Sequence, residues 1–214
     1  MVNIRYASMR SMDISNGEGV GVALFVQGCH FHCPNCFNSE TWSFNDGKEW
    51  TVEVKSKFLE LVDRPYIKRV SILGGEPLAE ENIDDVLDLV TEINKRYNTP
   101  QDRVCVKDKN NNILTDFSDK IRLSSPQKSI WLYTGYEWKH IFDQQWHYHP
   151  KTQEKLSIGR WRRQQIISKC DVLVDGTYVD SKHDITLRYR GSKNQNLIDV
   201  TKTLEHGDIV LWDK

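Results

Sequence analysis

The sequence lacks the features of two common protein classes. Its longest apolar stretch has about seven residues, far below the roughly 20 that a membrane-spanning helix needs. Lys and Arg number 29 and Asp and Glu number 30, so no net charge favours binding to nucleic acid or to an anionic membrane. We therefore expect neither a membrane protein nor a nucleic-acid-binding protein.

Cysteine is also scarce, with five residues in a chain of 214. An odd, sparse count does not form a disulfide framework, and the chain does not begin with a charged and then apolar leader and a small-residue cleavage site. We therefore expect a protein of the reducing cytoplasm. Cys105 and Cys170 have no partner cysteine nearby in the sequence, which predicts buried free thiols rather than ligands.

The length and composition predict one α/β domain over residues 1–214, large enough to bury a core. Nearly continuous apolar runs predict buried parallel strands, and apolar residues at helical spacing predict helices between them. The strands are Gly21–Val26, Arg69–Leu73, Ile130–Thr134 and Asp171–Val174, and the helices are Thr51–Val62, capped by Thr51, and Glu80–Tyr97. In the first helix, the spacing places Val52, Val54, Phe58, Leu59 and Val62 near one face. The β-α-β order implies a parallel sheet with right-handed crossovers.

Two segments interrupt this alternation and are interpreted as insertions. Residues 98–128 contain Pro100, Pro126 and an Asn-rich turn between short strand-like pieces, which predicts an inserted hairpin. Residues 138–163 are polar and aromatic. We expect them to form a second inserted loop within the same domain.

Three of the five cysteines form a cluster with C-x3-C-x2-C spacing. Cys29, Cys33 and Cys36 follow directly on the apolar run that ends at Val26. Thiolates are the usual ligands of iron–sulfur clusters, in which four positions are normally filled, so three cysteines predict a metal centre with one open position. The alternative is a structural zinc site completed by His30 or His32.

A second motif, Gly74-Gly75-Glu76-Pro77, comes directly after a predicted strand. By itself it is typical of an ordinary turn, because paired glycines allow positive φ and proline ends a strand. Ligands of open α/β sheets, however, bind beyond the carboxyl ends of the strands, and the cysteine cluster also follows a strand end. We therefore expect both motifs to face one cleft, where a carboxylate could receive an ammonium group.

Together, the cysteine spacing and Gly74–Pro77 resemble the radical S-adenosylmethionine (SAM) enzymes. Further motifs resemble one family among them, the activating proteins of anaerobic (class III) ribonucleoside-triphosphate reductases. These motifs are Asn16–Val20 (NGEGV), Phe25–Cys29 (FVQGC), Trp131–Tyr136 (WLYTGY), Asp171–Gly176 (DVLVDG) and Arg190–Gln195 (RGSKNQ). The resemblance implies a partial, open β/α barrel that carries the two insertions.

The resemblance also implies the cofactors and the residues that hold them. Cys29, Cys33 and Cys36 would bind one [4Fe–4S] cluster, and SAM would occupy its open position through its amino and carboxylate groups. The further SAM-binding residues would be Gly74, Gly75 and Glu76 for the methionyl part, the backbone of Asn35, Cys36 and Phe37 for the adenine, and Thr134 and Asp175, which would contact SAM or a monovalent cation. No residue beyond the cluster and SAM is expected to be catalytic. Many radical SAM enzymes carry an aromatic residue where this chain has Asn35, so Phe37 is the expected adenine contact.

The implied activity is reductive cleavage of SAM to a 5′-deoxyadenosyl radical that creates a glycyl radical on the anaerobic ribonucleotide reductase. The partners would be this reductase and an electron donor such as a flavodoxin. Two alternatives remain: an activator of another glycyl radical enzyme or a small-molecule synthase, and a non-catalytic zinc or iron–sulfur protein. The Arg188–Gln195 segment is suited to gripping backbone carbonyls or acidic groups of a partner, although its composition also fits a solvated hairpin turn.

Overall fold

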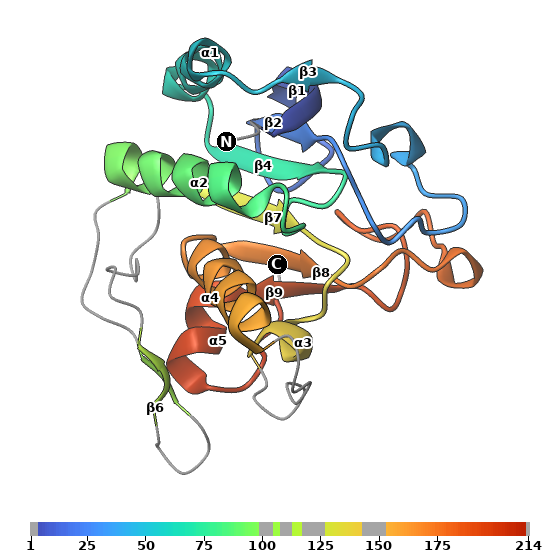
Figure 1. The fold of residues 1–214 in the computed structure, drawn as a ribbon, viewed down its shortest axis with the longest axis vertical. Helices are drawn as coiled ribbons and strands as arrows, with labels where there is room; N and C mark the ends of the chain where they lie inside the picture. Colours follow the sequence, from blue (N-terminus) through green and yellow to red (C-terminus); the bar gives the residue numbers. More distant parts are fainter. Residues whose placement is uncertain (1–3, 99–104, 108–112, 117–126, 143–152, 213–214) are drawn as a thin grey trace.

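The computed structural model describes residues 4–98, 105–107, 113–116, 127–142 and 153–212. Its centre is a seven-stranded sheet with the order β3-β1-β2-β4-β7-β8-β9 (Figure 1). The four inner strands are parallel neighbours: β2 (Gly21–Val26), β4 (Arg69–Gly74), β7 (Ser129–Tyr133) and β8 (Val172–Asp175). The four predicted strands are thus confirmed to within one residue at each end.

Antiparallel strands extend this parallel centre on both sides. β1 (Arg5–Asp13) pairs with β2, β3 (Lys48–Glu49) pairs with β1, and β9 (Asn196–Asp199) pairs with β8. These three strands were not predicted from the sequence. The sheet is mixed and open, so the predicted α/β class is confirmed while the sheet as a whole is not parallel.

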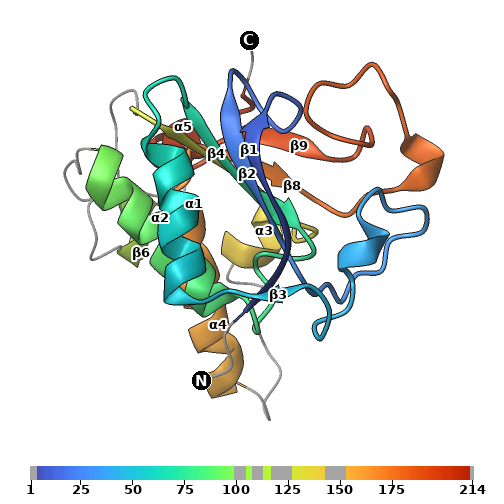
Figure 2. The same cartoon turned by 90° about the horizontal axis from the view of Figure 1, so that it is seen from above.

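The helices pack against one face of the sheet. They are α1 (Val52–Asp63), α2 (Ile83–Tyr97), α3 (Trp138–Phe142), α4 (Gln153–Ser168) and α5 (Val200–His206). Figure 2 shows α1, α2 and α4 gathered on one side, with the loops that follow β2 and β8 on the other. Two short 3-10 helices, Ser39–Thr41 and Asp180–Lys182, lie in those loops. In the described part of the chain, no helix is long and apolar enough to cross a membrane.

Helix α1 begins as predicted, because the side chain of Thr51 accepts a hydrogen bond from the backbone N–H of Val54. Phe58, Leu59 and Val62 are buried in the core. The prediction was wrong for Val52, whose side chain is 79% exposed. Val52 is the first residue of the helix, and its side chain lies away from the face that buries Phe58, Leu59 and Val62.

The first insertion contains the predicted hairpin, because β5 (Cys105–Lys107) pairs antiparallel with β6 (Ile113–Asp116). The second is not simply an inserted loop. Its two ends belong to α3 and α4, and α4 leads from β7 to the parallel strand β8. Trp138 and Phe142 are buried and stack with their ring centroids 4.1 Å apart. These two aromatic residues therefore pack in the core. Residues 143–152 lie outside the described part of the chain.

Candidate metal and cofactor site

The cysteine loop and the Gly74–Pro77 turn leave the sheet at adjacent strand ends. Val26 and Gly74 are paired partners in the parallel ladder. Beyond them, the backbone N–H of Gly75 donates to the carbonyl of Val26 at 2.9 Å, and that of Glu76 donates to the carbonyl of Gly28 at 2.7 Å. The two motifs therefore hold each other in place through their main chains.

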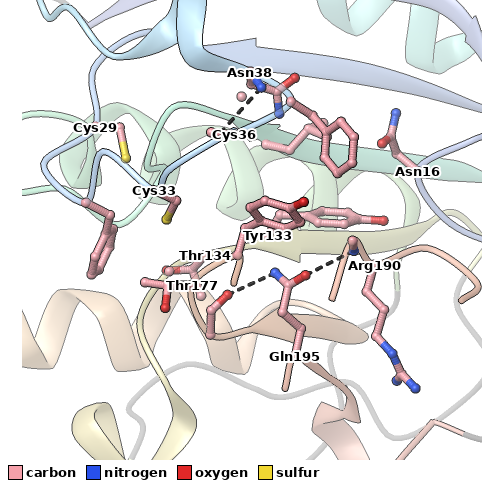
Figure 3. Close-up of a pocket in the computed structure, with 18 of the residues that line it drawn as sticks. Asn16, Cys29, Cys33, Cys36, Asn38, Tyr133, Thr134, Thr177, Arg190 and Gln195 are labelled. Atoms are coloured by element: carbon pink, nitrogen blue, oxygen red, sulfur yellow. Dashed lines mark hydrogen bonds between the residues drawn. The ribbon is translucent and has the colours of Figure 1, made fainter. Parts of the chain in front are cut away.

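Both motifs face one pocket of about 630 Å³, which confirms that they share a cleft. This volume lies within the range of roughly 300–1,000 Å³ that is usual for ligand sites. The predicted site residues that line the pocket are Cys29, Cys33, Cys36, Phe37, Gly74, Gly75, Glu76 and Thr134. In Figure 3, Cys29 and Cys33 lie on one side of the pocket, and Asn16 and Arg190 lie on the other.

The three thiols are presented by a loop with unusual backbone geometry. His32 and Asn35 have positive φ values of 46° and 55°, a conformation that is uncommon for residues other than glycine. All three cysteines are partly exposed, and none forms a disulfide. Burial raises the pKa of the Cys29 and Cys33 thiols. Metal binding at this loop therefore has to displace protons.

The two histidines of the alternative zinc site make other contacts in the structure. Among the described residues, no group of three or more His, Cys, Asp or Glu side chains could hold a metal ion. His30 instead contacts Glu81, with 3.0 Å between Nε2 and Oε1, and the ring of His32 stacks on Trp42. Three thiols that border one pocket are the donor set that an iron–sulfur cluster uses.

The paired glycines are required by the contact between the motifs. A Cβ atom at position 75 would lie 2.3 Å from the carbonyl oxygen of Gly28. Gly74 has a φ of +107°, and a Cβ atom there would lie 2.8 Å from backbone atoms of Phe25 and Val26. Any larger residue would push the turn away from the start of the cysteine loop.

Glu76 is buried, and donors of its own chain surround its carboxylate. Oε1 accepts hydrogen bonds from the backbone N–H of Leu78 at 2.8 Å and from the hydroxyl of Thr134 at 2.7 Å, while Oε2 accepts from the N–H of Gly135 at 2.7 Å. Burial raises the pKa of Glu76 to about 7, because these hydrogen bonds offset only part of the desolvation. Glu76 therefore ties the end of β7 to the turn after β4.

Two predicted site residues do not line the pocket. Asp175 is buried, and its carboxylate accepts hydrogen bonds from the N–H of Trp138 at 2.9 Å and from the side-chain amide of Asn196 at 2.8 Å. Asn35 is exposed and donates to Asp180 at 3.0 Å. Both side chains thus make contacts within the protein, whereas the neighbouring Phe37 reaches the pocket and its ring lies 5.2 Å from that of Tyr178.

The loop between β1 and β2 also lines the pocket, a role that the sequence did not reveal. Ser15 and Asn16 lie in its wall. The loop is held by the fully buried Arg69, which donates to the carboxylate of Asp13 at 2.8 Å and to its backbone carbonyl at 2.7 Å. Burial acts to raise the pKa of Asp13, but hydrogen bonds from Arg69 and Asn16 outweigh it and lower the pKa. The Asn16–Gly19 motif (NGEG) could have indicated that this loop lines the site. Arg69, which donates to the carbonyls of Asn16 and Glu18, lies more than fifty residues further along the chain.

The segment from Gly176 to Gln195 forms the remaining wall. Its ends are tied by Gln195, whose amide donates to the carbonyl of Gly176 at 2.9 Å and accepts from the N–H of Gly191 at 3.0 Å (Figure 3). Its members in the wall include Tyr178 and Arg190. The sequence indicated the second half of this segment as a partner contact but did not place it beside the cysteines.

Comparison with known proteins agrees with this arrangement. A family model described as a 4Fe-4S single cluster domain matches residues 15–107 and 105–198. The anaerobic ribonucleoside-triphosphate reductase-activating proteins of Salmonella typhimurium and Escherichia coli K12 are each 30% identical to this chain over 194 residues, which is 90% of the chain and 96% of the relative. The protein of the same name from Enterobacteria phage T4 is 25% identical over 194 residues, covering 91% and 93% of the two chains. The chain therefore belongs to the family of anaerobic ribonucleoside-triphosphate reductase-activating proteins, with a 4Fe-4S single cluster domain.

Proposed function

We propose that this chain is a radical SAM activase of an anaerobic ribonucleotide reductase. A [4Fe–4S] cluster, when bound, would supply the electron that splits SAM into methionine and a 5′-deoxyadenosyl radical. That radical takes a hydrogen atom from a backbone glycine of the reductase, which leaves 5′-deoxyadenosine and a glycyl radical. The observation that carries the proposal is that Cys29, Cys33 and Cys36 line the same pocket as the Gly74–Glu76 turn.

The chain's own residues would bind and orient the two cofactors. The thiolates of Cys29, Cys33 and Cys36 would hold the cluster, and the position that they leave unfilled would be available to SAM. Gly74 and Gly75 bring main-chain atoms to the pocket without intervening side chains. Phe37, which is 65% exposed and lines the pocket, offers an apolar face to the adenine.

Glu76 and Thr134 would act in SAM binding mainly as a rigid support. Because the carboxylate of Glu76 already has three donors, an ammonium group of SAM would join an existing network rather than create it. We assign Asp175 and Asn35 an indirect role at most, since neither lines the pocket. In this proposal, residues 1–214 form one radical SAM domain, and the open sheet is the partial barrel of that superfamily.

The proposed partners are the reductase and a low-potential electron donor such as a flavodoxin. The reductase is the partner because the relatives that this chain matches are named as its activating proteins. The protein substrate also has a physical role. A radical formed in a pocket that opens to solvent would be lost unless the partner covers it and brings its glycine within reach.

The test is anaerobic reconstitution with iron and sulfide, followed by reduction in the presence of SAM. We expect four irons and four sulfides per chain, release of 5′-deoxyadenosine, and a glycyl-radical EPR doublet when the reductase is added. A Cys33→Ser variant should lose all three signals, whereas Cys170→Ser, which changes a buried thiol outside the pocket, serves as the matched control.

The outcomes separate the alternatives. One zinc per chain and no SAM cleavage would refute the proposal in favour of a non-catalytic metal protein. SAM cleavage without a glycyl radical on the reductase would instead indicate the activator of another glycyl radical enzyme or a small-molecule synthase.

A further inference from the structure

The pocket opens to solvent beside an exposed apolar residue. Ile185 lines the pocket and, at 88%, is the most exposed of the large apolar residues that the structure describes. Leu187 lines the same pocket and is partly exposed. Apolar side chains at the mouth of a pocket contribute binding free energy when a ligand removes them from water. This edge of the pocket is therefore suited to a partly apolar ligand.

The loop between β1 and β2 continues the same edge. This loop and the segment that carries Ile185 both pack on the buried ring of Trp131. A Cβ atom at Gly17 would lie 2.7 Å from that ring, and the ring centroid of Tyr189 lies 5.2 Å from its centroid. The two segments therefore share one border of the pocket, here called the outer rim and defined by Ser15, Asn16, Asp184, Ile185 and Leu187.

Arg10 adds an accessible cation beside the outer rim. It lines the pocket, its side chain is 52% exposed, and its guanidinium carbon lies 4.5 Å from the centroid of the Phe25 ring. Arg10 stands opposite Ala23 in the antiparallel pair of β1 and β2, so its side chain lies on the same face of the sheet as Phe25. A guanidinium that stacks on a ring keeps its N–H groups available for other partners.

The positive charge of Arg10 is not balanced by its neighbours. Its one ion-pair partner among the described residues is Asp13, at 3.5 Å, and the same carboxylate pairs with the guanidinium of Arg69 at 2.8 Å. One carboxylate therefore faces two guanidinium groups. A ligand that brings acceptor oxygens to Arg10 would complement the remaining charge.

A segment of the protein substrate meets both requirements. Its main-chain carbonyls accept hydrogen bonds from a guanidinium, and its apolar side chains can cover Ile185. Near a glycine, no side chain shields these carbonyls. SAM belongs instead at the thiol end in the proposed function, and Asn16 of the outer rim lies on the opposite side of the pocket from Cys33 (Figure 3).

We propose that Arg10 and the outer rim dock the glycine-bearing segment of the protein substrate. Arg10 donates to main-chain carbonyls of the segment, and Ile185 packs against its apolar side chains. This inference rests on the proposed function and adds the docking surface to it. Both residues are positioning residues, since they hold the segment and take no part in the transfer of the hydrogen atom.

The test measures the dissociation constant of the reductase for the reconstituted full-length protein by anaerobic calorimetry. Arg10→Met keeps an apolar stem over Phe25 but removes the donors and the charge, and Ile185→Ser removes the apolar contact. Each variant should raise the dissociation constant roughly 5- to 50-fold. The matched controls lie on the helices: Arg162→Met, at an arginine of α4 that pairs with Asp84, and Val52→Ser, at a residue of α1 that is 79% exposed. Both controls should leave the dissociation constant unchanged.

Two further measurements keep the test specific. The dissociation constant of SAM, measured without the reductase, should stay within about 2-fold of the wild type in both variants. The rate of glycyl-radical formation, followed by EPR, should show a raised KM for the reductase and a nearly unchanged kcat, because positioning residues of this kind contribute to binding of the segment. Ile185→Ser tests the surface independently of Arg10→Met, since its side chain is almost fully exposed and its loss leaves the core intact.

An unchanged dissociation constant of the reductase in both variants, while the wild type forms the radical normally, would refute this docking surface and leave the proposed function intact. An equal loss of SAM affinity would also overturn it, because the rim would then serve the cofactor. If the wild type neither bound the reductase nor formed a radical on it, the proposed function and this surface would both fail.

Discussion

Asn82 provides the sharpest test of how the site is held together, because it bridges the two motifs. Its buried side-chain Nδ2 donates to the carbonyl of Gln27 at 3.0 Å and to the carbonyl of Glu76 at 2.8 Å. It also stands at the N-cap position of α2, yet its side chain makes no capping hydrogen bond. The side chain therefore stabilises the contact between the cysteine loop and the turn after β4 rather than the helix.

Replacement of Asn82 by Ala removes two hydrogen bonds, each of which contributes roughly 0.5–1.5 kcal/mol. We expect the free energy of unfolding to fall by about 2 kcal/mol. Asn82→Asp keeps the shape but places carboxylate oxygens against two carbonyl oxygens in a buried position. At pH 8 it should be less stable than the Ala variant by at least about 1 kcal/mol. The difference should shrink at low pH, where a protonated Asp can donate one hydrogen bond.

The measurement is urea unfolding of the metal-free chain under anaerobic conditions, followed by iron analysis after reconstitution. Asn45→Ala, at an exposed position, is the control and should change the free energy of unfolding by less than about 0.5 kcal/mol. Because the bridged carbonyl of Gln27 lies two residues before Cys29, iron content should also fall in both Asn82 variants. The reasoning fails if Asn82→Ala is as stable as the control, or if Asp and Ala are equivalent at pH 8.

Other predictions concern the same contact and its charges. Gly75→Ala should lose iron, because its Cβ would lie 2.3 Å from a backbone oxygen of the cysteine loop. In the control Gly159→Ala, in α4, the new Cβ meets no atom within 3.4 Å, so this variant should retain iron. Equal iron content in the two variants would contradict this prediction. The pKa of Glu76 is raised from 4.5 to about 7, so the folded state binds more protons than the unfolded state between these values. The stability of the wild type relative to Glu76→Gln should therefore fall by about 3 kcal/mol from pH 4.5 to pH 8, and a rise with pH in chemical denaturation would refute it. Cys33→Ser should lose cluster iron while Cys170→Ser keeps it, and loss in both would disprove the assignment of three cysteine ligands.

The parallel centre of the sheet could be predicted because its physical signature is local. Strands β2, β4, β7 and β8 are buried, so their apolar residues run almost without interruption. The strand β1 alternates between buried, intermediate and exposed residues and carries two arginines, and β3 has only two residues. Such strands form because they can pair with the edge of an existing sheet. Their own sequence does not show whether such an edge is present.

The same distinction applies to the site. The cysteines and the Gly74–Pro77 turn could be found because each is a short, contiguous motif, whose residue types and spacing can be read directly from the sequence. The roles of Glu76 and Asp175 could not, because a carboxylate after a strand has the same sequence pattern whether it faces a ligand or its own chain. The donors that surround these groups, including Gly135 and Asn196, come from distant segments. Only the folded structure reveals that both carboxylates already have partners.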